Sequence, residues 1–229
     1  MPPEIDSDAL LELARNNTAG ARSELIENIT AFPLADHNAM SDHERSLLYD
    51  ILNSIVHDAE MSVRLTMSAC LAELPDAPRD LVRLLANDAI DIAYPILTKS
   101  GVLQDEDLLE IIRNRTMEHQ LAISVRRAIS EDVSAGLVET ANENVIGSLL
   151  RNQDASISRQ TMEYLVEESK RFDSFQEPIL RRRELDPELV TRMFAWVSGA
   201  LRQSILDDWD LDPGVVDSLL QRAVSREIQ

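Results

Sequence analysis

The chain has 229 residues, of which 44% are hydrophobic, and its 41 acidic and 22 basic residues give a net charge of −19. This composition supplies enough apolar material for a core, and the single cysteine, Cys70, excludes an intrachain disulfide or a zinc site built from several thiolates. The acidic surface repels a nucleic-acid backbone. Because the sequence also lacks a signal-peptide pattern and any run of about 18 apolar residues, we expect a cytoplasmic protein that neither binds nucleic acid nor inserts into membranes.

The first 57 residues show helical patterning and are expected to form a helical cap at one end of the fold. Ser41 and Glu44 stand three residues apart, the spacing at which each side chain satisfies the other residue's free backbone N–H at a helix start. Apolar residues then recur at helical intervals: Leu47, Leu48, Ile51, Leu52, Ile55 and Val56. The segment is predicted to be an amphipathic helix.

A loose repeat with a period of about 25 to 30 residues occupies residues 58–206. Each unit reads as a first helix, a short polar turn that bears the next cap, and a second helix with an apolar centre. Caps are predicted at Ser130 and at Asp186, which precedes Pro187. A helix pair this short buries its apolar face only by stacking on its neighbours, so the prediction is an all-α, HEAT-like α-solenoid of about five helix pairs. The units begin DAEMSVRLTM, DAIDIAYPIL, TMEHQLAISV, ENVIGSLLRN and FDSFQEPILR.

Residues 207–229 are predicted to form a C-terminal capping helix that completes one continuous structural unit with the cap 1–57 and the repeats 58–206. Its apolar stripe either docks on the last repeat or mediates homodimerisation. The stripe consists of Val216, Leu219, Leu220, Ala223 and Val224.

Several segments of the repeat region resemble a known family when they are taken in order. They are ELPDAPRDLVRLLANDAIDIAYPIL, LQDEDLLEII, the run from His119 to Ile123, LLRNQDASIS and FQEPILRRRELDPELV, and they resemble the bacterial, mostly alphaproteobacterial, domain of unknown function family 2336. The resemblance implies a HEAT-like superhelix of bacterial origin and carries no catalytic residue across. Members of the family are often longer, so the sequence leaves open whether this chain is full length or the N-terminal portion of a longer protein.

The sharpest enzymatic pattern in the sequence is the set of His37, His43, His57 and Asp58. A histidine followed by a His-Asp pair on adjacent helices supplies the imidazole and carboxylate ligands of metal-dependent phosphohydrolases. The competing interpretation makes His43 part of the first turn of a helix and puts His57 and Asp58 at its end. His119 and Cys70, which have apolar neighbours, are expected to be a structural histidine and an inert thiol.

Basic residues stand where the first helices of successive repeats end, and in a solenoid these positions would stack into a basic ridge. One interpretation is that the cations complement the negative C-terminal ends of the helix dipoles. The other is a surface that pairs with carboxylates or phosphates of a partner. The residues of this basic ridge are Lys99, Arg126, Arg127, Arg151, Arg181, Arg182 and Arg183.

The sequence therefore predicts a non-catalytic scaffold that binds a protein or peptide partner on a solenoid surface and requires no cofactor or metal. Two alternatives stay open. One is a metal-dependent phosphohydrolase-like enzyme that uses His37, His57 and Asp58. The other is a sensor of a small anionic ligand that binds at the basic ridge.

Overall fold

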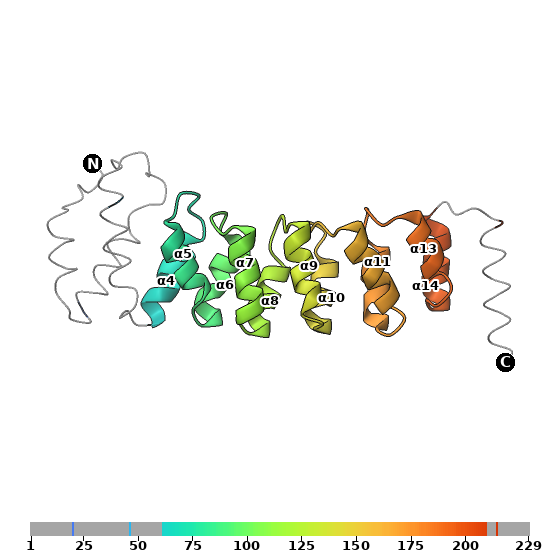
Figure 1. The fold of residues 1–229 in the computed structure, drawn as a ribbon, viewed down its shortest axis with the longest axis horizontal. Helices are drawn as coiled ribbons and strands as arrows, with labels where there is room; N and C mark the ends of the chain where they lie inside the picture. The colour runs from blue at the N-terminus through green and yellow to red at the C-terminus, as the bar shows by residue number, and fades with distance from the viewer. Residues whose placement is uncertain (1–19, 21–45, 47–60, 210–213, 215–229) are drawn as a thin grey trace. The chain divides into compact units, whose positions relative to one another are not determined.

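The computed structural model describes residues 20, 46, 61–209 and 214, and within residues 61–209 every regular element is a helix (Figure 1). The prediction of an all-α fold is confirmed over this range. The expected N-terminal cap lies almost entirely outside the described residues, as does the apolar stripe of the C-terminal helix. The contacts divide the chain into two compact units, Met1–Ile123 and Ser124–Gln229.

The described part of the first unit contains five helices, the last of which extends one residue past the division. Helix α4 packs against α6, and α5 packs against both of them. Ion pairs join α5 to α7. Alternate helices are therefore neighbours, which is the arrangement that successive helix pairs adopt when one pair covers the next. The helices are α4 (Met61–Leu71), α5 (Arg79–Ala86), α6 (Ile90–Lys99), α7 (Asp105–Asn114) and α8 (Met117–Ser124).

The described part of the second unit contains six α-helices and one short 3-10 helix. Helix α10 packs against α9 and α12, and α11 packs against α13, so alternate helices are neighbours here as well. The elements are α9 (Glu131–Glu139), α10 (Glu143–Arg151), α11 (Arg159–Glu168), η3 (Asp173–Phe175), α12 (Gln176–Leu180), α13 (Pro187–Met193) and α14 (Gly199–Asp208).

The second helix of every described pair begins in the same local register. Its N-cap residue follows a buried apolar residue, as in the hydrophobic staple at helix starts. The caps predicted at Ser130 and Asp186 are confirmed: the Ser130 hydroxyl accepts from the Val133 N–H at 3.2 Å, and Asp186 accepts from the Glu188 N–H at 2.8 Å, whereas the cap predicted at Ser41 lies outside the described residues. The N-caps are Pro78, Gln104, Ser130, Ser158 and Asp186, which stand 26 or 28 residues apart. The buried residues before them are Ala77, Leu103, Ile129, Ile157 and Leu185.

The same register places one face of each second helix in the core. The third, fourth, seventh and eighth residues after the caps lie on one side of a helix, and nineteen of these twenty residues are buried. Seventeen of the nineteen are apolar, and the two exceptions are Asp107 and Ser134. A polar side chain at these two positions therefore needs a specific structural explanation.

Hydrogen bonds join residues one repeat apart within each unit. Ser68 on α4 donates a hydrogen bond to the Ile92 carbonyl on α6 in the first unit, and the hydroxyls of Ser124 and Ser148 lie 2.7 Å apart in the second. Both pairs are separated by 24 residues in the chain, close to the period of the repeat. Ala93 is fully buried in α6, as expected where small residues let two helices come close.

Candidate functional site

The basic residues of the predicted ridge do lie at the ends of first helices. Lys99 is the last residue of α6 and Arg151 the last of α10, while Arg181 directly follows α12. Arg126 and Arg127 follow the end of α8. Lys99 belongs to the first unit, where its ammonium group pairs with Glu73 at 2.8 Å, and the other ridge residues belong to the second unit.

Arg182 corrects the predicted ridge, because it is buried and only 1% of its surface is exposed. Its guanidinium donates to the carbonyls of Leu150 at 3.2 Å and Asn152 at 2.9 Å, and also to that of Ala155. Glu184, which is partly exposed, pairs with it from the same turn. A guanidinium carries five donors and no acceptor, so it satisfies carbonyls that the end of α10 and the following loop leave without helical partners. Arg182 therefore does not contribute to an exposed basic surface.

Three other arginines of the ridge line one pocket of about 610 Å³ in the second unit. The pocket lies between the C-terminal end of α10 and the segment formed by η3 and α12, which pack against each other. Gln153 and Ser174 add an amide and a hydroxyl to its lining. The full lining is Arg151, Gln153, Ser174, Glu177, Pro178, Arg181 and Arg183.

The pocket lining carries more positive than negative charge. Arg181 forms an ion pair with Glu177 one helical turn before it, and both side chains are more than half exposed. Arg151 and Arg183 are exposed, and neither forms an ion pair within the described part of the chain. The Arg151 guanidinium lies across Gly147, where an added Cβ would be 3.5 Å from Nη1. Two guanidinium groups thus remain available for an anion, on a chain whose net charge is −19.

This arrangement is suited to binding oxyanions rather than to covalent chemistry. Each free guanidinium can form two parallel hydrogen bonds with a carboxylate or phosphoryl group. Sequence reasoning found the arginines from the bias towards basic residues at helix ends. It missed Gln153, Ser174, Glu177 and Pro178, because their place in the lining depends on the packing of α10 against η3 and α12.

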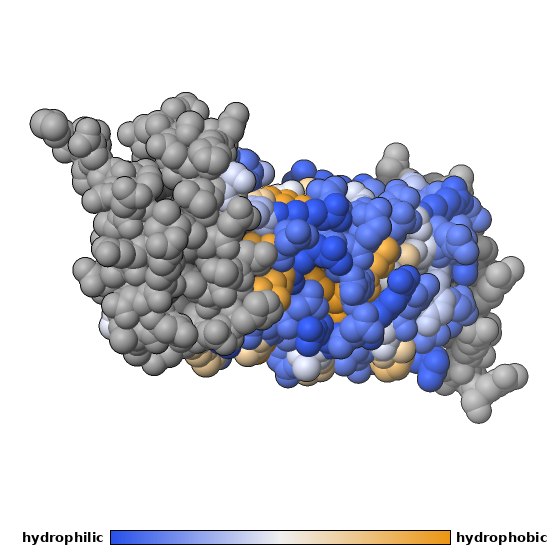
Figure 2. All heavy atoms as spheres, turned by 60° about the vertical axis from the view of Figure 1, so that its left-hand side comes forward, coloured by the Kyte–Doolittle hydropathy of each residue, from blue (hydrophilic) through white to orange (hydrophobic). Residues whose placement is uncertain are grey.

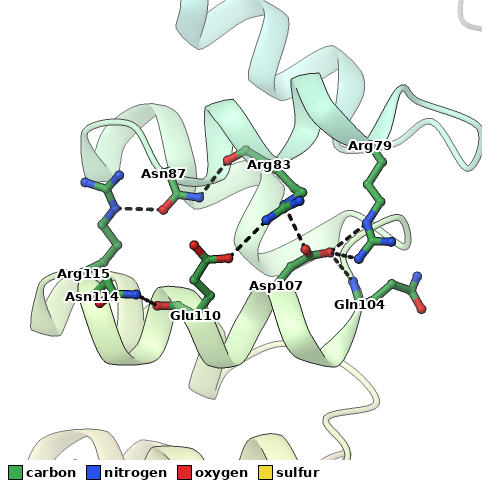
Figure 3. Close-up of polar contacts among 8 residues, drawn as sticks. All are labelled: Arg79, Arg83, Asn87, Gln104, Asp107, Glu110, Asn114 and Arg115. Atoms are coloured by element: carbon green, nitrogen blue, oxygen red, sulfur yellow. Dashed lines mark hydrogen bonds and ion pairs between the residues drawn. The ribbon is translucent and has the colours of Figure 1, made fainter.

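A second polar cluster, between α5 and α7 in the first unit, is occupied by its own partners (Figure 3). The buried Asp107 carboxylate pairs with Arg79 at 2.9 Å and with Arg83 at 3.0 Å, and it accepts from the Gln104 N–H at 3.1 Å. Arg83 also reaches Glu110 at 3.1 Å. These contacts account for the buried carboxylate as a joint between two helices, not as a binding site. Asn87, Asn114 and Arg115 extend the cluster.

His119 is confirmed as a structural histidine. The ring is buried, its Nε2 lies 2.9 Å from the Asp88 carbonyl and its Nδ1 lies 3.0 Å from the Thr116 hydroxyl. A carbonyl only accepts, so Nε2 carries the proton and donates it. His37, His43, His57 and Asp58 lie outside the described residues. Within the described residues no group of three or more His, Cys, Asp or Glu side chains is placed to hold a metal ion.

Cys70 is half-buried, and burial raises the pKa of its thiol. The raised pKa reduces the fraction of reactive thiolate at neutral pH, in agreement with the expectation of an inert side chain. On the face drawn in Figure 2, the coloured surface is mainly hydrophilic, and hydrophobic residues are exposed only locally. None of the described helices combines the length and the apolar character that crossing a membrane requires.

Comparison with known proteins finds one family. No curated protein and no solved structure matches the chain significantly. A family described as "uncharacterised protein conserved in bacteria", DUF2336, matches residues 92–229, which is more than half of the chain and includes the whole arginine pocket. The resemblance noted in the sequence is thereby confirmed for the segments that follow residue 92, and the chain belongs to the bacterial family DUF2336.

Proposed function

We propose that the chain is a non-catalytic interaction scaffold, in which helix pairs stack into a HEAT-like superhelix that binds a protein or peptide partner. The observation that supports this most is the repeated register. Five caps stand at intervals of 26 or 28 residues, and nineteen of the twenty residues at the same four positions after them are buried. A helix pair with this pattern leaves an apolar face uncovered unless another pair stacks on it.

The lengths of the helices support the same proposal. The α-helices between Arg79 and Asp208 have five to ten residues, and isolated helices this short are marginal in water. Their stability must come from neighbours in the array. Such an array exposes an extended surface whose residues come from several pairs, and this is the usual basis of partner binding by repeat proteins.

The arginine pocket is the proposed contact point for the partner. Two of its exposed arginines, Arg151 and Arg183, have no described ion-pair partner, while the chain as a whole is acidic. A partner with an acidic surface would therefore be attracted to this pocket and repelled by most of the remaining surface. Arginine is also enriched among the residues that dominate the energetics of protein interfaces.

Affinity capture from the source bacterium tests the proposal. The bait is the full chain, compared with a variant that carries Arg151→Glu and Arg183→Glu. Arg182 is left unchanged because it is buried. The control bait carries Arg113→Glu and Arg115→Glu, which change the net charge equally at exposed arginines that lie outside the basic ridge and form no ion pair within the described residues.

We expect a stoichiometric protein partner that is retained by the native chain and by the control bait and is lost from the pocket variant. If none of the three baits retains a partner above the level of an unrelated acidic protein, the scaffold proposal is wrong. A circular dichroism spectrum of each bait establishes that it is folded.

A further inference from the structure

We infer that the arginine pocket recognises carboxylate side chains of an acidic peptide segment, with Arg151 and Arg183 as the residues that bind them. The inference rests on the proposed scaffold function and specifies the chemistry of its partner. It follows from three features of the pocket: its surplus charge, its position at helix ends and its size.

The positive charge of the pocket exceeds what the fold requires. Cations near the C-terminal end of a helix usually offset the partial negative charge of its last carbonyls. For α10 this role belongs to Arg182, which donates directly to the carbonyls of Leu150 and Asn152. Arg151 and Arg183 are therefore not needed to satisfy these groups, and burial does not constrain them.

The ionisable groups of the lining are three arginines and Glu177, so the lining carries a net charge of +2. Glu177 neutralises Arg181, which leaves one positive charge on Arg151 and one on Arg183. The two residues come from different elements, the end of α10 and the turn after α12. This distribution favours two singly charged carboxylates on neighbouring parts of a segment, each bound by its own guanidinium.

A phosphoryl group fits the same pocket less well. Phosphate sites usually use the N-terminal ends of helices, where backbone N–H groups point at the ligand and the helix dipole favours negative charge. This pocket lies at the opposite, C-terminal end of α10 and along η3 and α12, and its lining contains the carboxylate of Glu177. A compact dianion such as phosphate would be repelled both by the negative end of the α10 dipole and by the Glu177 carboxylate. Two separate carboxylates can instead each bind one guanidinium, that of Arg151 or that of Arg183.

The size and the neutral residues of the pocket agree with a peptide ligand. A volume of about 610 Å³ lies within the range typical of sites that hold organic ligands. The Gln153 amide can donate to a peptide carbonyl and accept from a peptide N–H, while Pro178 provides an apolar wall. The Ser174 hydroxyl already donates to Glu143 at 2.6 Å, so it offers only an acceptor to a ligand.

Fluorescence anisotropy with the full chain tests the inference. The probe is a labelled peptide of eight glutamates, and the reference is the same peptide with glutamines. We expect saturable binding of the glutamate peptide alone, and a loss of about tenfold or more in affinity for the Arg151→Gln, Arg183→Gln variant, because two charge-assisted contacts disappear. The Arg113→Gln, Arg115→Gln control should change the affinity less than about twofold, since its charges lie outside the pocket and are screened by salt.

Competition separates a carboxylate site from a phosphate site. Inorganic phosphate should displace the peptide no better than acetate at equal ionic strength. Displacement by phosphate at a much lower concentration would overturn the inference, as would equal losses in the pocket and control variants or no saturation below about 1 mM peptide.

The outcomes also distinguish this inference from the scaffold proposal. If the captured partner is retained by the folded Arg151→Glu, Arg183→Glu bait, the pocket does not bind it and the inference fails, while the scaffold proposal stands. If no bait retains a partner, the scaffold proposal fails whatever the peptide experiment shows.

Discussion

Replacement of Arg182 by alanine should destabilise the protein far more than replacement of the adjacent Arg181. Arg182 is 1% exposed and donates to three backbone carbonyls, whereas the side chain of Arg181 is 74% exposed and forms one ion pair with Glu177. The two substitutions remove the same atoms and the same charge. Their effects on unfolding therefore isolate the contribution of burial and hydrogen bonding.

The magnitude follows from the carbonyls that Arg182 leaves behind. The Asn152 carbonyl keeps a second donor, the Ala155 N–H at 3.3 Å, whereas Arg182 is the one donor that we identify in the described structure for the carbonyls of Leu150 and Ala155. An orphaned buried polar group costs about 1–3 kcal/mol, so two of them cost about 2–6 kcal/mol. Lost packing of the side chain adds to this, and relief of the buried charge's desolvation subtracts from it.

We expect a loss of about 3–5 kcal/mol in the free energy of unfolding for Arg182→Ala. The expected loss for Arg181→Ala is below about 1 kcal/mol, because exposed ion pairs contribute little. Urea unfolding followed by circular dichroism measures both values. Arg182→Lys retains the charge but not the planar fork that reaches three acceptors, so it should recover only part of the loss. Equal destabilisation by Arg182→Ala and Arg181→Ala would refute the assignment of Arg182 to the interior.

Three further predictions concern single positions, and urea unfolding measures the stability of each variant. Ser134→Ala should raise the free energy of unfolding by about 1 kcal/mol, because the buried hydroxyl has no hydrogen-bond partner among the described residues; a loss of stability would contradict this. Asp107→Ala should cost about 2–4 kcal/mol, and Asp107→Leu should cost less, because an apolar side chain can replace a buried ion pair; the reverse order would show that the ion pairs themselves dominate. Gly147→Ala should add about 0.5–1 kcal/mol from helix propensity, since its Cβ would make only ordinary contacts. Gly147→Leu should instead displace Arg151 and weaken binding of the glutamate peptide, whereas unchanged binding would argue against the position of Arg151 in the pocket.

The second helices could be predicted well from sequence because their signals are local. A cap residue, the apolar residue before it and the apolar face after it all lie within about ten residues of one another, and each acts through the backbone of its own helix. Ser130 and Asp186 illustrate this, since their side chains accept from N–H groups two or three residues ahead. No knowledge of the tertiary structure was needed to identify either cap.

The basic ridge could be predicted only in part. The bias towards cations at the ends of first helices is a local signal, and it placed Arg151 and Arg181 correctly. Contacts that are distant in sequence determine which of the three consecutive arginines is buried. The carbonyls that hold Arg182 lie 27 to 32 residues earlier in the chain, at the end of the preceding first helix. A sequence in which Arg181, Arg182 and Arg183 look alike contains no local signal for this contact.

The repeated register shows which polar and charged residues the fold uses and which it does not. Seventeen of the nineteen buried positions after the caps are apolar, so a polar residue in this set either has partners or destabilises the fold. Asp107 forms ion pairs with Arg79 and Arg83 and accepts from the Gln104 N–H, whereas the Ser134 hydroxyl has no hydrogen-bond partner within the described structure. The same reasoning applied to the helix ends separates Arg182, whose donors are used within the fold, from Arg151 and Arg183, whose donors have no such use in the described residues. A charged group that the fold does not require, in a pocket of a chain with the opposite net charge, is the feature that a binding partner would explain.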